Sequence, residues 1–139
     1  METYYIYTDG ASRGNPGPAA AGFVLKDSSG IVREKCGKKL GVRTNNFAEY
    51  SAVILALEKL KDLVAKPSGS VLILNLDSEL AVKQLTGVYR VKNPTIAQFI
   101  EKIRLLEHFY QDVVYKHVSR VQNKEADKLV NEVLNGKYD

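Results

Sequence analysis

The chain is predicted to adopt an α/β fold in which helices cover both faces of a mixed five-stranded sheet. Apolar and polar residues alternate with a period of two in the first third of the sequence, and the period changes to about 3.6 after Thr44. A dense aliphatic run at residues 70–76 follows the first helical segment, which is typical of a strand buried between parallel neighbours. The length of 139 residues suits one domain, and we expect a single domain over residues 1–139.

The first three predicted elements are strands that cover residues 4–9, 20–26 and 31–40. A Gly/Pro-rich turn separates the first two strands, and a second turn at residues 27–30 leads into the third. Because short turns connect these strands, we expect an antiparallel meander.

A helix is predicted after Thr44, and it ends before Pro67. Its apolar residues recur at helical spacing and form one stripe: Ala48, Ala52, Val53, Leu55, Ala56, Leu60 and Leu63. The strand at 70–76 follows, and we expect it to be buried on both faces. The remaining predicted elements are helices at 77–86 and 94–109, a strand at 113–118 and a closing helix at 123–134.

Composition and charge exclude several classes of protein. Apolar residues make up 45% of the chain and charged residues 26%, which excludes disorder as the main state. No apolar run approaches the roughly 18 residues of a membrane span, and the N-terminus lacks the features of a secretory signal. We therefore expect a cytoplasmic protein with the single cysteine, Cys36, as a packing residue. We also expect a monomer. The formal charge of +4 modestly favours nucleic acid as a partner.

Four acidic residues occupy positions where a carboxylate can point out of the core: Asp9, Glu49, Asp77 and Asp127. Each also has a purely structural explanation. Asp9 could form a hairpin turn with Gly10, although the later Gly/Pro-rich segment already supplies the turn. Glu49 lies three residues after Asn46, which is the spacing of a helix capping box. Asp77 could be a helix N-cap, and Asp127 could favour the positive end of a helix that Asn123 caps.

The four carboxylates lie within longer motifs. These are residues 7–18 (YTDGASRGNPGP), 44–49 (TNNFAE), 76–78 (LDS) and 123–127 (NKEAD). In order and spacing, over nearly the whole chain, they resemble the motifs of the type 1 ribonuclease H family. The resemblance implies the ribonuclease H-like sheet with strand order 3-2-1-4-5. It also implies a metal site where the first and fourth strands adjoin.

In that family the carboxylates that match Asp9, Glu49, Asp77 and Asp127 bind two metal ions at the catalytic site, and the one matching Asp9 is shared. Divalent cations remove the repulsion between converging carboxylates, and oxygen-only ligands favour Mg²⁺, with Mn²⁺ as a substitute. One ion activates water and the other stabilises the leaving oxygen. The resemblance thus implies an endoribonuclease that hydrolyses the RNA strand of RNA/DNA hybrids and leaves 5′-phosphate and 3′-hydroxyl ends.

The resemblance also implies which residues contact the hybrid. Asn15, Asn45 and Asn46 match minor-groove positions, where a protein can sense 2′-hydroxyls. Thr44 matches the residue that grips a DNA phosphate, and Arg43 is expected to assist it by charge. From the residues alone, Asn15 could be only a turn residue and Asn46 only a helix cap.

Three features depart from the family pattern. Residues 87–93 connect two helices directly where many members insert a basic, Trp-containing protrusion, and the chain has no Trp, so we expect weak affinity for the DNA strand. Glu79 stands where the family often has Gln, and its charge would repel phosphate. Residues 119–122 lack the histidine that many members carry before the last carboxylate. His117 falls in the last predicted strand, where we expect a structural role.

Two other functions stay open at this point. One is a catalytically silent module that binds hybrids, and the presence of all four carboxylates argues against it. The other is a nuclease of the same superfamily that cuts double-stranded RNA or DNA. The missing protrusion and Glu79 leave this second alternative open.

Overall fold

The computed structural model describes residues 2–137, and its helices and strands follow the predicted order. The strands are β1 (Glu2–Ser12), β2 (Gly17–Lys26), β3 (Val32–Arg43), β4 (Ser70–Leu76) and β5 (Asp112–His117). The helices are α1 (Asn45–Leu63), α2 (Glu79–Leu85), α3 (Pro94–Glu107) and α4 (Lys124–Leu134), and a 3₁₀ turn (Pro67–Gly69) precedes β4. Within residues 2–137, no helix combines the length and the apolar character that a membrane span needs.

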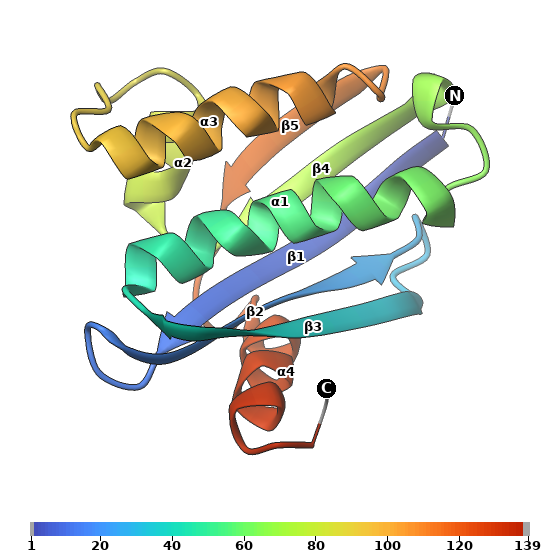
Figure 1. Ribbon diagram of the computed structural model, residues 1–139. Helices are drawn as coiled ribbons and strands as arrows, with labels where there is room; N and C mark the ends of the chain where they lie inside the picture. The colour runs from blue at the N-terminus through green and yellow to red at the C-terminus, as the bar shows by residue number, and fades with distance from the viewer. Residues whose placement is uncertain (1, 138–139) are drawn as a thin grey trace.

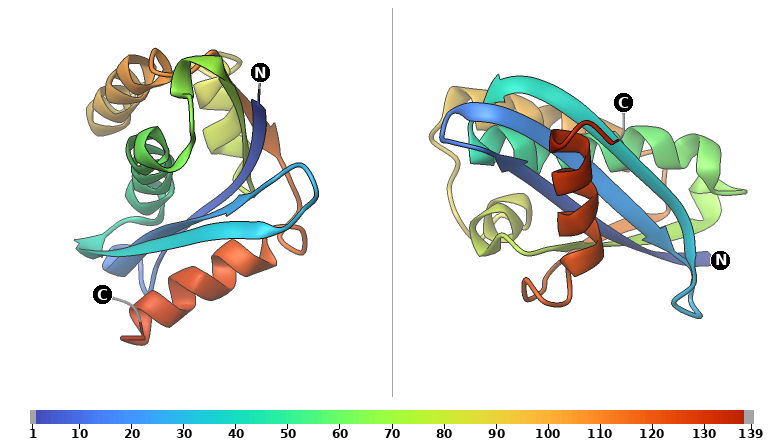
Figure 2. Two further views of the ribbon diagram at one scale, coloured as in Figure 1. Left: turned by 90° about the vertical axis from the view of Figure 1, so that its right-hand side faces the viewer. Right: turned by 90° about the horizontal axis from the view of Figure 1, so that it is seen from below.

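The strands form one sheet in the order β3-β2-β1-β4-β5, which confirms the predicted order. β1, β2 and β3 form the antiparallel meander, whereas β4 pairs with β1 and β5 in parallel. Three helices, α1 to α3, lie on one side of this sheet, and α4 lies on the other side (Figures 1 and 2). The predicted coverage of both faces is therefore confirmed.

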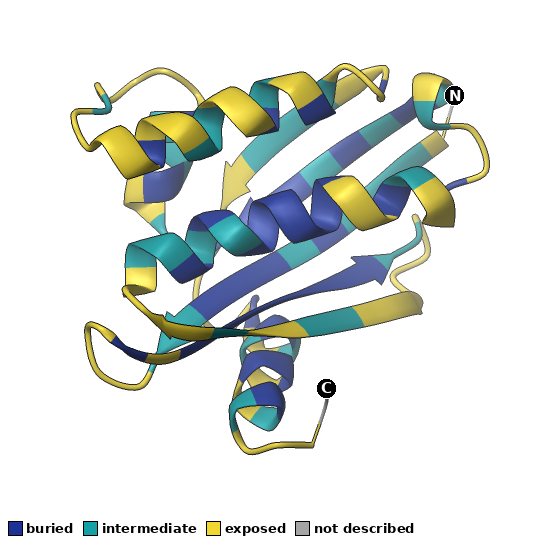
Figure 3. Cartoon of the chain, in the orientation of Figure 1, coloured by how far each residue is buried: buried dark blue, intermediate teal, exposed yellow. Residues whose placement is uncertain are grey.

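Each face of the sheet has its own apolar core. The larger core packs α1, α2 and α3 against residues such as Ile6, Phe23 and Leu74. The smaller core lies under α4 and consists of Ala20, Val24, Ala126, Leu129, Val130 and Val133. Figure 3 shows that most of α1 is buried, because this helix lies between the sheet and α3. Leu63 was predicted to belong to the buried stripe, but at the last position of α1 it is 41% exposed.

The β1 and β2 strands extend further than predicted. β1 continues to Ser12 because residues 9–12 pair with residues 19–22 of β2. The expected burial of β4 on both faces holds only in part, since Val71 and Ile73 are half-buried. On the α4 side of the sheet, α4 packs against β1, β2 and β3, so the first half of β4 receives little cover there. Cys36 lies in β3 and packs, half-buried, against the larger core, as expected.

Candidate active site

Asp9 and Asp77 lie side by side where the parallel pairing of the two central strands ends. Asp9 pairs with Gly22 in the β1–β2 ladder, so it belongs to a strand and the hairpin-turn alternative is wrong. The parallel β1–β4 ladder ends at the pair of Thr8 and Leu76. Asp77, the residue after β4, therefore lies next to Asp9. Asp77 is not the N-cap of α2, because the Ser78 side chain accepts the capping hydrogen bond from the Ala81 N–H at 3.2 Å.

Glu49 reaches the same place because α1 crosses β1 in direct contact. A Cβ atom on Gly10 would lie 2.1 Å from the backbone of Ala48, so only glycine permits this approach. The helix is capped by Thr44, whose Oγ1 accepts a hydrogen bond from the Phe47 N–H at 3.1 Å. The capping role considered for Asn46 is therefore wrong. Seven residues line one small cavity here: Thr8, Asp9, Gly10, Glu49, Leu76, Asp77 and Ser78.

Asp127 approaches from the opposite face of the sheet, in the first turn of α4. The fully buried Asn123 fixes this end of the helix, since its Nδ2 donates to the Thr8 carbonyl at 2.9 Å. Its own carbonyl accepts a hydrogen bond from the Asp127 N–H at 3.1 Å. Asn123 is the N-cap residue of α4, as predicted, although its side chain makes no capping hydrogen bond. It instead connects the strand residue before Asp9 to the helix that carries Asp127.

The four carboxylates form one electrostatic unit. Burial, followed by the charges of Asp77, Asp127 and Glu49, raises the pKa of Asp9 from its ordinary value of 3.8 to about 8. Burial also raises the pKa of Glu49, and the charge of Asp77 adds to this, while a hydrogen bond from Ser78 opposes it. Charge on this cluster is therefore costly unless a cation neutralises it.

The donor set fits a hard divalent cation, because all of its members are carboxylates. Among residues 2–137, no three acidic, histidine or cysteine side chains converge into a ready-formed metal cage. Two buried side-chain oxygens in that range lack a hydrogen-bond partner, Glu49 Oε2 and Asn123 Oδ1, and both belong to this site. Buried unpaired oxygens are rare, and here they mark a place where a cation or its water ligands would find acceptors.

The five residues matched to hybrid contacts lie together beside this site. Asn15, Arg43, Thr44, Asn45 and Asn46 line one surface groove of about 710 Å³. Asn15 Oδ1 accepts a hydrogen bond from the Asn45 N–H at 3.0 Å, and Asn45 Oδ1 accepts one from the Ser12 N–H at 2.9 Å. Asn15 is thus more than a turn residue, since it ties the β1–β2 turn to the start of α1. In the described part of the chain, no hydrogen bond uses the Nδ2 donors of Asn15 and Asn45.

The structure shows how the three segments that depart from the family pattern are arranged. No helix forms between α2 and α3, where the protrusion is missing. Glu79 is exposed at the start of α2 and pairs with Lys83 at 3.3 Å. His117 is the last residue of β5 and is paired with Leu76, but its side chain is exposed instead of packed.

Comparison with known proteins identifies the family. A family model described as reverse transcriptase-like matches residues 7–133. Ribonuclease HI of Halobacterium salinarum is 42% identical over 130 residues, which cover 94% of this chain and 63% of that relative. The chain belongs to the type 1 ribonuclease H family. It spans less than two thirds of the length of this curated ribonuclease H.

Two solved ribonuclease H structures agree with the fold over almost their whole length. RNase H1 from H. salinarum superposes with a TM-score of 0.90 at 40% identity, covering 96% of this chain and 98% of that one. LC11-RNase H1, in complex with an RNA/DNA hybrid, gives a TM-score of 0.91 at 40% identity, covering 96% and 97%.

Proposed function

We propose that this chain is a metal-dependent endonuclease that hydrolyses the RNA strand of RNA/DNA hybrids. The observation that carries the proposal is the set of four carboxylates near the place where the parallel pairing of β1 and β4 ends, in which the charges of the other three act on Asp9. A similar ribonuclease H1 has been solved with an RNA/DNA hybrid, which supports the choice of substrate. The expected products carry 5′-phosphate and 3′-hydroxyl ends.

Asp9, Glu49, Asp77 and Asp127 would hold two Mg²⁺ ions, with Mn²⁺ as a substitute. When bound, the ions supply an activated water and stabilise the leaving oxygen. The protein's part is to hold the carboxylates in place: Gly10 lets α1 bring Glu49 against β1, and Asn123 ties the start of α4 to Thr8. Because burial and the neighbouring carboxylates raise the pKa of Asp9, cation binding at this cluster favours release of its proton.

The neighbouring groove would bind the hybrid. The Nδ2 groups of Asn15 and Asn45 are donors, which suits 2′-hydroxyls and base edges in a wide minor groove, and Asn46 lies beside them. The Thr44 hydroxyl accepts the capping hydrogen bond, so its own proton stays available for a DNA phosphate oxygen. Arg43, stacked 4.7 Å above the Phe47 ring, adds positive charge at the same position. Capping and substrate binding therefore coexist at the start of α1.

The experiment that tests this proposal is hydrolysis of a labelled hybrid by Asp9→Asn. The change removes one charge and keeps the shape, so we expect hydrolysis to be abolished while the far-UV circular dichroism spectrum is retained. Asp62→Asn, at an exposed position on α1, is the matched control and should keep wild-type rates. Wild-type turnover by a folded Asp9→Asn protein, at equal Mg²⁺ and hybrid concentrations, would refute the proposal.

A further inference from the structure

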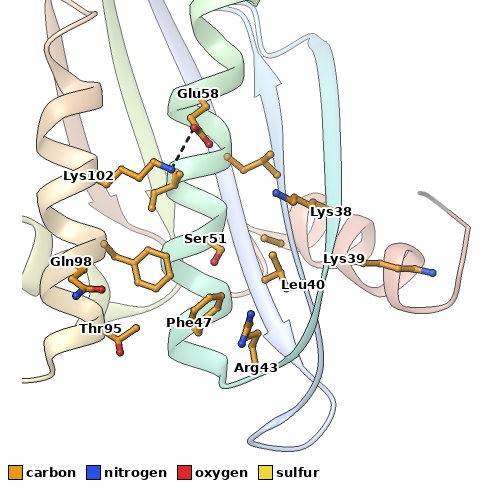
Figure 4. Close-up of a pocket in the computed structure, with 14 residues that line it drawn as sticks. Lys38, Lys39, Leu40, Arg43, Phe47, Ser51, Glu58, Thr95, Gln98 and Lys102 are labelled. Atoms are coloured by element: carbon orange, nitrogen blue, oxygen red, sulfur yellow. Dashed lines mark ion pairs between the residues drawn. The ribbon is translucent and has the colours of Figure 1, made fainter.

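A second groove runs along the outward side of α1, between β3 and α3 (Figure 4). Its volume is about 510 Å³, within the range of roughly 300 to 1,000 Å³ that is usual for ligand sites. Arg43, Phe47 and Thr95 line both this groove and the proposed substrate groove, so the two are continuous at the start of α1. We call it the α1 groove.

The rims of the α1 groove carry surplus positive charge. Lys38 points from β3 toward α1, whereas the side chain of Lys39 turns away (Figure 4). Lys102 lines the opposite rim of the groove, on α3, and forms an ion pair with Glu58 at 3.6 Å. None of the ion pairs within residues 2–137 involves Lys38 or Arg43. Both cations are therefore available to an anionic ligand.

The floor of the α1 groove is apolar and aromatic. Phe47 and Phe99 meet edge to face, with ring centroids 4.8 Å apart, and both are half-buried. The Arg43 guanidinium covers the Phe47 ring at 4.7 Å, which leaves the other face of this planar cation free. A guanidinium plane or an aromatic ring is a surface on which an unpaired base can stack, and nearby lysines suit its phosphates.

We propose that the α1 groove binds an unpaired extension of the DNA strand of the hybrid. This inference rests on the proposed function, because Arg43 and Thr44 would hold the DNA strand where the two grooves meet. Continuity with the substrate groove favours a nucleic acid over an acidic peptide, which the same charges would also attract. The α1 groove would supply affinity for the DNA strand. No protrusion between α2 and α3 is present to supply that affinity.

The test compares binding of a blunt hybrid with binding of the same hybrid carrying a short single-stranded DNA extension, at either its 5′ or its 3′ end. Fluorescence anisotropy without divalent ions measures affinity without cleavage. We expect one of the two extensions to tighten binding by the wild type about tenfold. Lys38→Glu should reduce that gain to less than about twofold while blunt-hybrid affinity stays within about twofold.

Lys35→Glu is the matched control, because Lys35 lies on the same strand and pairs with Val24 of the α4-side core. It makes the same change in net charge and should keep the tighter binding that the extension gives.

Three results would overturn the inference: neither extension tightens binding, Lys38→Glu weakens both hybrids equally, or only an acidic peptide shows Lys38-dependent binding. If the protein cleaves the blunt hybrid but neither extension changes the binding affinity, this inference alone fails. If the blunt hybrid is neither bound nor cleaved, the proposed function fails with it.

Discussion

At the residue scale, Asp9 lies where the fold disfavours its charge. Its pKa is about 8 in the fold and has an ordinary value of 3.8, so between these pH values the unfolded chain has lost a proton that the folded chain keeps. A group with a raised folded pKa contributes stability that is fully present below the unfolded pKa. That stability is lost as pH rises through the folded pKa.

We therefore expect Asp9 to make the metal-free protein less stable as pH rises from about 4 to about 8. In Asp9→Asn this contribution is absent, so the free energy of unfolding of the variant relative to wild type should increase with pH. Urea unfolding of both proteins in chelator, at several pH values across the window, measures the difference. A difference that does not change with pH would show that Asp9 is not the group with the raised pKa.

Asn123 is expected to act on the site through Asp9 and Asp127. Asn123→Ala removes the hydrogen bond to Thr8 and should cost about 1–3 kcal/mol of unfolding free energy. Mg²⁺ should raise the Tm of the wild type by mass action, and the rise should be smaller in Asn123→Ala and in Asp77→Asn. Asn135→Ala, at the exposed position that follows the same helix, is the control. An equal Mg²⁺-dependent rise in wild type and Asn123→Ala would limit Asn123 to a structural role.

The missing loop histidine leads to a prediction about His117, which is exposed at the end of β5 beside Leu76. If the carboxylate site alone activates water, His117→Ala should keep activity within about tenfold, since loss of a general acid or base costs about 10² to 10⁴. The Arg120 guanidinium can only donate hydrogen bonds, so Arg120→Ala should affect product release more than chemistry. A folded His117→Ala protein that binds hybrid normally but cleaves about a thousandfold more slowly would restore a histidine-assisted mechanism.

At the element scale, glycines set how closely helices approach the sheet. Gly10 lets α1 touch β1, and on the other face Gly22 and Gly37, which pair between β2 and β3, lie under Leu129 and Val133 of α4. A Cβ on Gly37 would lie 2.4 Å from Val133 Cγ2. Both helices that carry site carboxylates therefore depend on positions without a side chain.

Gly10→Ala should separate α1 from β1 and destabilise the protein by about 1–3 kcal/mol or more, because the new Cβ meets backbone that cannot move aside. It should also lower hydrolysis by displacing Glu49. Gly69→Ala is the control, since its Cβ would be 3.4 Å from the flexible Lys66 side chain. Chemical denaturation and hybrid hydrolysis measure both effects. Equal stability of the two variants would contradict the close contact.

The sequence predicts elements well where local signals agree and less well where tertiary contacts decide. The bounds of β4 match the prediction, because Gly69 and Asp77 flank a continuous aliphatic run. β1 was predicted too short, since residues 10–12 have weak strand preference and are held by pairing with β2. A capping role for Asn46 stayed open because propensity does not rank adjacent polar residues. In the structure the Thr44 side chain makes the capping hydrogen bond.

Some features of the site were likewise predicted from local sequence signals, whereas others depend on tertiary contacts. Motifs in the sequence predicted the four carboxylates and the residues of the proposed substrate groove, and the structure brings these side chains together. The link from Asn123 to Thr8 was missed, because the two residues are 115 positions apart and only the sheet brings them into contact. The α1 groove was missed for the same reason, since Lys38 and Lys102 come from distant segments.

At the scale of the whole molecule, the sheet topology explains why the site lies where it does. β1, β4 and β5 run parallel, so their carboxyl ends meet at one edge, and ligand sites in open α/β sheets lie outside such ends. Asp9, Asp77 and His117 are all at this edge. The proposed substrate groove begins beside it at the N-terminus of α1, and the α1 groove continues from there along the helix.

The carboxylates at this edge are proposed to cleave RNA within hybrids. The most direct measurement is a strand-resolved cleavage assay with Mg²⁺ on an RNA/DNA hybrid, a duplex RNA and a duplex DNA of one sequence, with each strand labelled in turn. We predict internal cleavage of the hybrid's RNA strand to 5′-phosphate and 3′-hydroxyl products, an intact DNA strand, and at least about tenfold slower cleavage of both other duplexes. Binding of the hybrid without cleavage, or faster cleavage of duplex RNA or duplex DNA, would contradict the proposed function.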